Sequence, residues 1–178
     1  PEEKKLQDAM LAMRYANGPT IAAVRGMALG GGCELAIHCA KRVVAMESYI
    51  GLVEVGVGLI PGGGGLTYIA RRAAEMAAPA NADVFNFVRD GFTAAAMAKV
   101  GTSAIESGKL GYLLDSDIVV PHKDELLYVA IAQAKAMFDS GSRAPVRKRF
   151  PVAGRSAIAT IKGQLANMRD GGFISAHD

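Results

Sequence analysis

The sequence predicts a single domain of the α/β class, and three observations lead to this prediction. Short apolar runs of β-forming residues alternate with longer segments whose apolar residues recur at helical spacing, as in layered α/β folds. The 178 residues are 51% hydrophobic and 21% charged, which is enough to bury one core. No internal repeat or linker-like stretch divides the chain. We therefore expect one domain over residues 1–178, with a core in 19–120 and a helical part in 121–178.

The first quarter of the chain predicts a strand, a glycine loop, a helix and a second strand. Residues 4–16 show helical spacing of apolar residues and are followed by the helix breaker Asn-Gly-Pro. The run TIAAVR at 20–25 predicts a buried strand, and RVVAM at 42–46 predicts another. Between them, three glycines precede a short helix expected at 33–40. This order is typical of a βαβ-type unit.

The remaining elements are expected to be mostly helical. The chain is irregular and rich in glycine from 52 to 60, and PGGGG then introduces the next helix. The later elements that we expect are a helix at 64–74, a helical segment at 83–99, a strand at 116–120, and helices at 123–138 and 156–168.

Composition and charge exclude several classes of function. The formal net charge of +3 permits an anionic ligand but does not indicate a nucleic-acid partner. Glycine, proline or charge interrupts the longest apolar runs, so no membrane span is expected. Cys33 and Cys39 have no partners at zinc-ligand spacing, and we interpret His38 between them as a packed helix residue, so no metal site is expected. Two reduced core thiols suit a cytoplasmic protein.

Two glycine-rich stretches each carry one glutamate in apolar surroundings. ALGGGCELA at 28–36 contains Glu34, and LVEVGVGLIPGGGG at 52–65 contains Glu54. A glycine loop that leads into a helix presents backbone N–H groups, which can hold a phosphate or a developing oxyanion. An acid directly after the turn would repel phosphate, and the phosphate-loop and dinucleotide-binding patterns are missing. The pattern therefore favours an oxyanion hole beside an acid–base carboxylate.

The residues by themselves leave other interpretations open. Two carboxylates that face one cavity can divide the acid and base roles, because burial and mutual repulsion separate their pKa values. A glutamate in the first turn of a helix can instead simply complement the helix dipole. The glycines could likewise serve only the close packing of a strand against a helix.

The run PTIAAVRGMALGGGCELAIHCAKRVVA at 19–45, followed by GLVEVGVGLIPGGGG at 51–65, resembles the crotonase (enoyl-CoA hydratase/isomerase) superfamily. Both glutamates, both glycine clusters and their spacing coincide with the family pattern. With AMAKVGTSAIES and NMRDGGFISAHD further on, the chain is most similar to the crotonase half of bacterial bifunctional 3-hydroxyacyl-CoA dehydrogenases. The resemblance implies an α/β, crotonase-like (ClpP/crotonase) ββα spiral. We expect it to be incomplete at the N-terminus and inactive alone, because the upstream turn that supplies the family's second oxyanion donor has no counterpart here.

The resemblance also implies roles for particular residues. Glu34 and Glu54 match the two hydratase glutamates, which hold the attacking water and exchange its proton with the substrate α-carbon. Gly31 matches the glycine whose N–H binds the thioester carbonyl, and Gly62 matches the one whose N–H helps to fix the water. Further substrate contacts are expected at Gly30, Leu59 and Pro61.

The function that this resemblance implies is hydration of a 2-enoyl-CoA thioester in fatty-acid β-oxidation, within a bifunctional 3-hydroxyacyl-CoA dehydrogenase. Alternatives are Δ3,Δ2-enoyl-CoA isomerisation and a non-catalytic module for acyl-CoA binding or oligomerisation. The acyl-CoA thioester is the substrate, no cofactor is expected on this chain, and NAD belongs to the separate dehydrogenase domain. A homo-oligomer of the trimer type is expected. The basic run Arg147-Lys148-Arg149 is interpreted as a solvated loop, with coenzyme A phosphates as its alternative partner.

Overall fold

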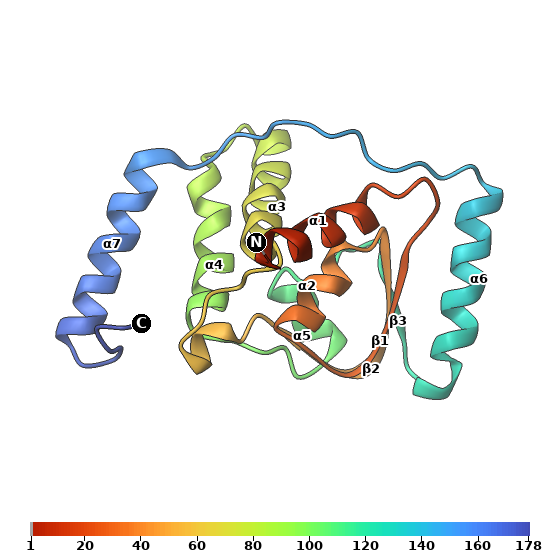
Figure 1. The fold of residues 1–178 in the computed structure, drawn as a ribbon, viewed down its shortest axis with the longest axis horizontal. Coiled ribbons are helices and arrows are strands. Elements are labelled where there is room, and N and C mark those ends of the chain that lie inside the picture. The colour runs from red at the N-terminus through yellow and green to blue at the C-terminus, as the bar shows by residue number, and fades with distance from the viewer. Residues whose placement is uncertain (1) are drawn as a thin grey trace.

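A parallel three-stranded sheet forms the centre of the protein, and helices cover it on both faces (Figure 1). The computed structural model describes residues 2–178. The sheet has the order β1 (Ile21–Leu29), β2 (Lys41–Gly51), β3 (Ile118–Val120). The helices are α1 (Glu2–Arg14), α2 (Gly31–His38), α3 (Gly65–Ala80), α4 (Val84–Ala96), α5 (Ala104–Lys109), α6 (Leu126–Asp139) and α7 (Gly154–Asp170), with 3₁₀ turns η1 (Glu54–Val57) and η2 (Lys123–Glu125).

The register of β1 against β2 decides where the two glycine-rich stretches meet. The strands are parallel and joined by α2, as expected for a strand–helix–strand unit. The register shifts between Val24 and Gly26, after which Leu29 pairs with Gly51. The carboxyl ends of both strands therefore lie side by side, and the N–H of Gly30 donates to the carbonyl of Gly51 at 2.9 Å. The loop after β1 and the loop after β2 leave the sheet together.

Two apolar clusters hold the sheet between its helices. On one face, Val43 and Val120 pack against Leu126 and Ala130 of α6. On the other face, the larger cluster includes Cys33 and Ile37 of α2, Tyr68 of α3, and Leu52, Tyr112 and Leu113 from connecting loops. Burial of a large apolar side chain stabilises a fold by about 1.5–3 kcal/mol, so these contacts fix α2 and α3 against the sheet.

The outer helices extend the molecule to both sides of this core. α4 packs against α3, and α7 lies beyond α4 on the side away from the sheet (Figure 1). Residues 142–153 form an extended segment that leads from α6 across the molecule to α7 (Figure 1). This segment passes over α1 and α3, whose residues line a cavity together with it.

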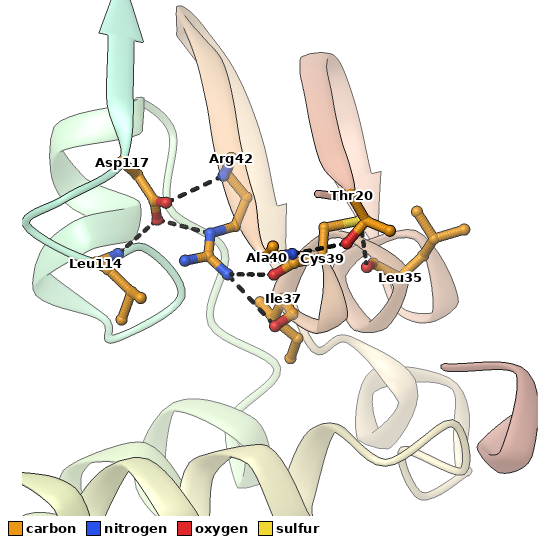
Figure 2. A network of polar contacts seen from close by, with 8 residues as sticks. All are labelled: Thr20, Leu35, Ile37, Cys39, Ala40, Arg42, Leu114 and Asp117. Carbon is orange, nitrogen blue, oxygen red and sulfur yellow. Dashed lines mark hydrogen bonds and ion pairs between the residues drawn. The ribbon is translucent and has the colours of Figure 1, made fainter. Parts of the chain in front are cut away.

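A buried ion pair joins the start of β2 to the turn before β3 (Figure 2). Arg42 donates its backbone N–H to Oδ1 of Asp117 at 3.0 Å and its Nε–H to Oδ2 at 2.6 Å. Its Nη1 donates to the carbonyls of Ile37 and Cys39, each at 3.4 Å. Asp117 also accepts the N–H of Leu114 at 2.7 Å. Both side chains are 1% exposed, so each buried charge is compensated by the other, while Nη2 of Arg42 has no hydrogen-bond partner among the described residues.

The expected strands and helices are present, but several of their boundaries were wrong. β1 was expected to stop before Gly26, yet it continues through this glycine, which has a φ of +67° at the register shift. β2 was expected to end at Met46, but it runs to Gly51 with Glu47 exposed and Ser48 buried. The hydroxyl of Ser48 donates to the carbonyl of Ala45 at 2.7 Å, which allows a polar residue inside the strand.

Several helix boundaries also differ from those expected from the sequence. α2 begins at Gly31 and not at 33, because the glycines themselves form its first turn. α3 continues past 74 to Ala80, even though Pro79 lies within it. α5 was not expected at all. Its signal was present, since Ser103 accepts the N–H of Glu106 at 3.2 Å while Glu106 accepts that of Thr102 at 2.8 Å, as in a capping box.

Candidate active site

Glu34 lies in the first turn of α2, directly after the glycine triplet. Its carboxylate is buried, with 2% of the residue exposed. Oε2 accepts the N–H of Gly63 at 2.9 Å, and Oε1 accepts the N–H of Gly65 at 2.8 Å. Because Gly65 opens α3, its N–H has no acceptor within that helix. The carboxylate thus links the N-terminal ends of α2 and α3.

Gly63 is needed here because a side chain would collide with the carboxylate. A Cβ at this position would meet Oε2 of Glu34 inside any permitted contact distance. A Cβ at Gly65 would lie 2.9 Å from Leu52 and 3.0 Å from Oε1 of Glu34. The run PGGGG therefore brings bare backbone against a buried acid, which is what the two N–H···O bonds require.

Glu54 reaches the same region from the loop after β2, as the first residue of η1. A Cβ at Gly30 would lie 3.2 Å from Oε1 of Glu54, and Gly30 has a φ of +54°, so glycine is required twice over at this contact. Oε2 of Glu54 is buried and has no hydrogen-bond partner among residues 2–178. Burial, followed by the charge of Glu34, raises the pKa of Glu54 above its ordinary value.

The structure therefore brings together the two glutamates that the sequence singled out, and it gives them different surroundings. Glu34 is held by two amide donors, whereas Glu54 keeps one oxygen free of partners. Two carboxyl groups in unlike environments can hold protons at different pH values. Such a pair can accept a proton at one position and deliver one at another.

Gly31 and Gly32 form the first turn of α2 and are both exposed. The amide of Gly31 has no acceptor within the helix, because the first-turn N–H groups of a helix have no carbonyl before them. A Cβ at Gly31 would meet nothing within 4 Å. The N-terminal end of α2 thus presents open backbone beside the carboxylates, where a donor to a developing oxyanion is useful.

The three other positions singled out from sequence lie on the loop that follows Glu54. Leu59 is exposed and Pro61 is buried, while the carbonyl of Gly62 accepts the side-chain amide of Gln7 from α1 at 2.9 Å. Pro61 lines an apolar cavity of about 220 Å³. Other residues around this cavity are Val55, Ile60, Leu66, Phe92, Ala96, Leu165 and Met168. The cavity lies where α4, α7 and the loop of Glu54 meet.

Sequence reasoning missed the roles of Gly63 and Gly65 as donors to Glu34. The assignment of Gly62 to the water stays a prediction, and its N–H has no acceptor among the hydrogen bonds of the described residues. The length of the glycine run was a signal for the two donors, since four successive glycines exceed what one tight turn needs. The bond partners themselves depend on the register of two loops that are 31 residues apart.

The histidine and the cysteines near the site have structural surroundings. Nδ1 of His38 lies 2.7 Å from the carbonyl of Glu34, and burial lowers the pKa of His38. Burial raises the pKa of Cys33, so its thiol stays protonated. In both residues, burial favours the uncharged form. Over residues 2–178, no cluster of three His, Cys, Asp or Glu side chains is arranged to hold a metal ion. Within the same residues, no helix combines the length and apolarity that crossing a membrane requires.

Comparison with known proteins gives consistent matches. A family model described as "Enoyl-CoA hydratase/isomerase" matches residues 2–101. The "Probable 3-hydroxyacyl-CoA dehydrogenase" of Bacillus subtilis is 36% identical over 180 residues, covering 98% of this chain and 22% of that protein. The "Fatty acid oxidation complex subunit alpha" of Colwellia psychrerythraea is 47% identical over 68 residues, covering 38% of this chain and 9% of that protein.

Solved structures support the same relationship. An enoyl-CoA hydratase from Bacillus anthracis superposes with a TM-score of 0.57 at 26% identity, over 76% of this chain and 46% of that one. This likeness confirms the fold that the sequence resemblance implied. The chain spans about a fifth of the Bacillus subtilis relative and about half of the Bacillus anthracis structure.

Proposed function

Because the chain belongs to the enoyl-CoA hydratase/isomerase family, we propose that it adds water to the double bond of a 2-enoyl-CoA thioester. The observation that carries this proposal is the pairing of Glu34 and Glu54. One carboxylate is fixed by two amides, and the other has a buried oxygen without a partner and a raised pKa. A hydratase needs this division, because water must lose a proton while the α-carbon gains one.

In the proposed reaction, the water oxygen bonds to C3 of the enoyl group while its O–H bond breaks. The π electrons of the C2–C3 bond move toward the thioester, whose oxygen becomes an enolate. The N–H of Gly31 donates to this oxygen, a contribution of about 2.7–4 kcal/mol for one such donor. One glutamate takes the proton of the water and the other delivers a proton to C2, so the pair ends with as many protons as it began.

Glu34 and Glu54 take different parts in this scheme. Both oxygens of Glu34 already accept amide N–H groups, so its remaining lone pairs are suited to orient the attacking water. Glu54 has the oxygen that is free of partners, and it is the better proton carrier toward C2. Its raised pKa brings it closer to the pH at which proton transfer in both directions is efficient.

The same observation favours Δ3,Δ2-enoyl-CoA isomerisation as a second candidate. Isomerisation moves one proton between two carbons, so one free carboxyl group is sufficient, and Glu54 provides it. The two reactions are distinguished by supplying 2-enoyl-CoA and 3-enoyl-CoA separately and identifying the product of each. A 3-hydroxyacyl product from 2-enoyl-CoA is the expected outcome for a hydratase.

The test of the proposed function is the hydration of crotonyl-CoA by the full-length protein, followed as the loss of enoyl absorbance. Replacement Glu54→Gln should lower kcat at least about 10²-fold with little change in KM, because the amide cannot carry the proton. Glu47→Gln, at an exposed position of β2, is the matched control and should keep the parent rate. Hydration at the parent rate by the Glu54 variant would refute the assignment.

The proposal also places the activity in fatty-acid β-oxidation, as part of a bifunctional 3-hydroxyacyl-CoA dehydrogenase. The dehydrogenase and fatty-acid oxidation relatives support this context. In this scheme, the apolar cavity beside Pro61 holds the acyl chain, which a series of substrates of increasing chain length would test. NAD-dependent oxidation of the hydration product by the full-length protein is the corresponding test of the second activity.

We further propose a homo-oligomer of the trimer type. α6 carries large apolar side chains that are exposed, namely Leu127, Tyr128, Ile131 and Phe138. A single helix that exposes four such residues is typical of a subunit interface. Light scattering of the full-length protein should give a multiple of the monomer mass, and a monomer mass would contradict this part of the proposal.

A further inference from the structure

A second cavity, of about 540 Å³, lies on the side of the molecule where the extended segment 142–153 passes over α1 and α3. Four basic residues line it: Arg14 at the end of α1, Arg71 on α3, and Lys148 and Arg149 on the extended segment. The lining includes one acidic residue, Glu75. None of the residues proposed for hydration lines this cavity.

Two of these arginines are partly withdrawn from water without adequate partners. The Nε atoms of Arg14 and Arg71 are buried and make no hydrogen bond within the part of the chain that the structure describes. The side chain of Arg71 is only 13% exposed, and its nearest carboxylate oxygen, on the half-exposed Glu75, lies 3.3 Å from Nε. Burial, followed by the charge of Arg14, lowers the pKa of Arg71. Two cations that repel each other in such a place are stabilised by an anion between them.

Tyr15 fixes the extended segment so that its basic residues face this cavity. The guanidinium of Arg147 lies 4.6 Å from the centre of the Tyr15 ring, and that of Arg14 lies 5.9 Å from it. Cation–π contacts of this kind are attractive and hold the cation against the ring face. Arg147 is thereby held against the Tyr15 ring. The next two residues, Lys148 and Arg149, line the cavity.

We propose that this cavity binds the diphosphate group of an adenosine-type nucleotide, at a site separate from the two glutamates. Arginine side chains grip phosphate oxygens in pairs, and four cations against one acid match the charge of a diphosphate. The aromatic ring of Phe150 is in the lining and offers a face on which a base can stack. The volume lies within the range of small-molecule sites, about 300–1,000 Å³.

The basic cavity lies near the carboxyl end of α2, the helix that carries Glu34. His38 lies one helical turn beyond Glu34, and its Nδ1 contacts the carbonyl of that residue at 2.7 Å. The charges of Arg71 and Arg14 both act on the buried His38 ring. A nucleotide bound at the arginines would therefore lie behind the helix that carries Glu34, on the opposite end of α2 from the glycine triplet.

Calorimetric titration of the full-length protein with pyrophosphate and with ADP, at one fixed ionic strength, tests this proposal. Both should bind, and ADP should bind more tightly because its base adds stacking. The double replacement Lys148→Gln with Arg149→Gln should weaken both affinities about tenfold or more, as expected for lost charge-assisted bonds. Both positions are exposed, so the fold should tolerate these changes. Arg155→Gln with Lys162→Gln, at exposed positions of α7 outside the cavity, removes the same charge and should leave both affinities unchanged.

A second variant, Arg71→Gln, should also weaken the binding of both pyrophosphate and ADP, provided that its melting temperature shows a folded protein. The adenosine diphosphate group could come from a free nucleotide or from a coenzyme A thioester, and the two sources are distinguished by titrating crotonyl-CoA into the Lys148/Arg149 variant. A loss of crotonyl-CoA affinity identifies the thioester, and an unchanged affinity identifies a free nucleotide. The Glu54→Gln protein should bind ADP like the parent, so failure of the hydratase proposal leaves this one intact. Absence of pyrophosphate and ADP binding, or equal losses in both double variants, would overturn the proposal.

Discussion

The backbone N–H of Gly63 donates to Oε2 of Glu34 at 2.9 Å, and there is no space at this glycine for a β-carbon. Glu34 lies in the first turn of α2 and Gly63 in the loop before α3, 29 positions further along the chain. The bond holds the carboxylate of Glu34 in one orientation inside an apolar environment, where an unpaired acid would be costly. The orientation of the acid therefore depends on the absence of a side chain on a neighbouring loop.

Replacement Gly63→Ala should displace Glu34 and lower both activity and stability. The new β-carbon would meet Oε2 of Glu34, so the carboxylate must leave its two amide donors. A displacement of this size is expected to lower the rate of crotonyl-CoA hydration about 10²-fold and to lower the melting temperature. Gly163→Ala on α7 is the control, because a β-carbon there would meet no atom within 4 Å. Full activity in Gly63→Ala would show that Glu34 does not need this donor.

Replacement Gly31→Val should affect the reaction while leaving the fold intact. No atom lies within 4 Å of a β-carbon at Gly31, so the added side chain extends into open space at the end of α2. In the proposed mechanism that space holds the thioester, and both a raised KM and a lowered kcat are expected. Gly163→Val on α7 introduces the same side chain at another open helix position and serves as the control. Parent kinetics in Gly31→Val, together with an unchanged melting temperature, would move the oxyanion donor elsewhere.

The pKa of Glu54 predicts a pH-dependent cost in stability. Burial, followed by the charge of Glu34, raises this pKa in the folded protein above the unfolded value of about 4.3. Between these two values the folded state binds the proton more strongly than the unfolded state, so the stability contributed by Glu54 falls as pH rises through this window. Glu54→Gln removes the ionisation and should melt at a higher temperature than the parent at pH 7.

The difference in melting temperature should shrink as the pH is lowered toward 4, where Glu54 is protonated in both states. Glu47→Gln is the comparison for an exposed glutamate of the same sheet and should show no such pH-dependent gain. A gain for Glu54→Gln that is equal at both pH values would contradict the assignment of the effect to ionisation.

Much of the architecture could be predicted from local patterns, and the site could be predicted in part. The strand cores at 20–25 and 42–46 were visible because buried parallel strands are apolar without interruption. The extension of β2 past Met46 could not be predicted, because Glu47 and Ser48 are residue types that are common in turns. Only the pairing of this segment with β1 shows that the strand continues. Glu34 and Glu54 stood out as acids among glycines, and the register of Leu29 with Gly51 explains why they meet.

The rest of the site depends on contacts between segments that are distant in sequence. The donors to Glu34 come from a loop whose position follows from the packing of α3 on the sheet, which no local pattern reports. The basic run Arg147-Lys148-Arg149 was interpreted from the sequence as a solvated loop, and each of its residues is exposed in the structure. Its proximity to Arg14 and Arg71 follows from the extended path of 142–153, which carries no helical or strand signal.

The ion pair of Arg42 with Asp117 is a further test of how the site is supported (Figure 2). Replacement Asp117→Ala would leave the guanidinium of Arg42, 1% exposed, without its counter-charge. Loss of one partner of a buried pair costs about 3–5 kcal/mol, so a large fall in the free energy of unfolding is expected. Asp90→Ala removes an acid from the exposed pair with Arg89 and should change stability by less than about 1 kcal/mol.

The double replacement Arg42→Met with Asp117→Ala should recover part of the loss, because no buried charge is then left unpaired. Denaturant unfolding of the four proteins measures these differences. Equal losses in the single Asp117 variant and the double variant would show that Arg42 stabilises α2 through the carbonyls of Ile37 and Cys39, independently of Asp117.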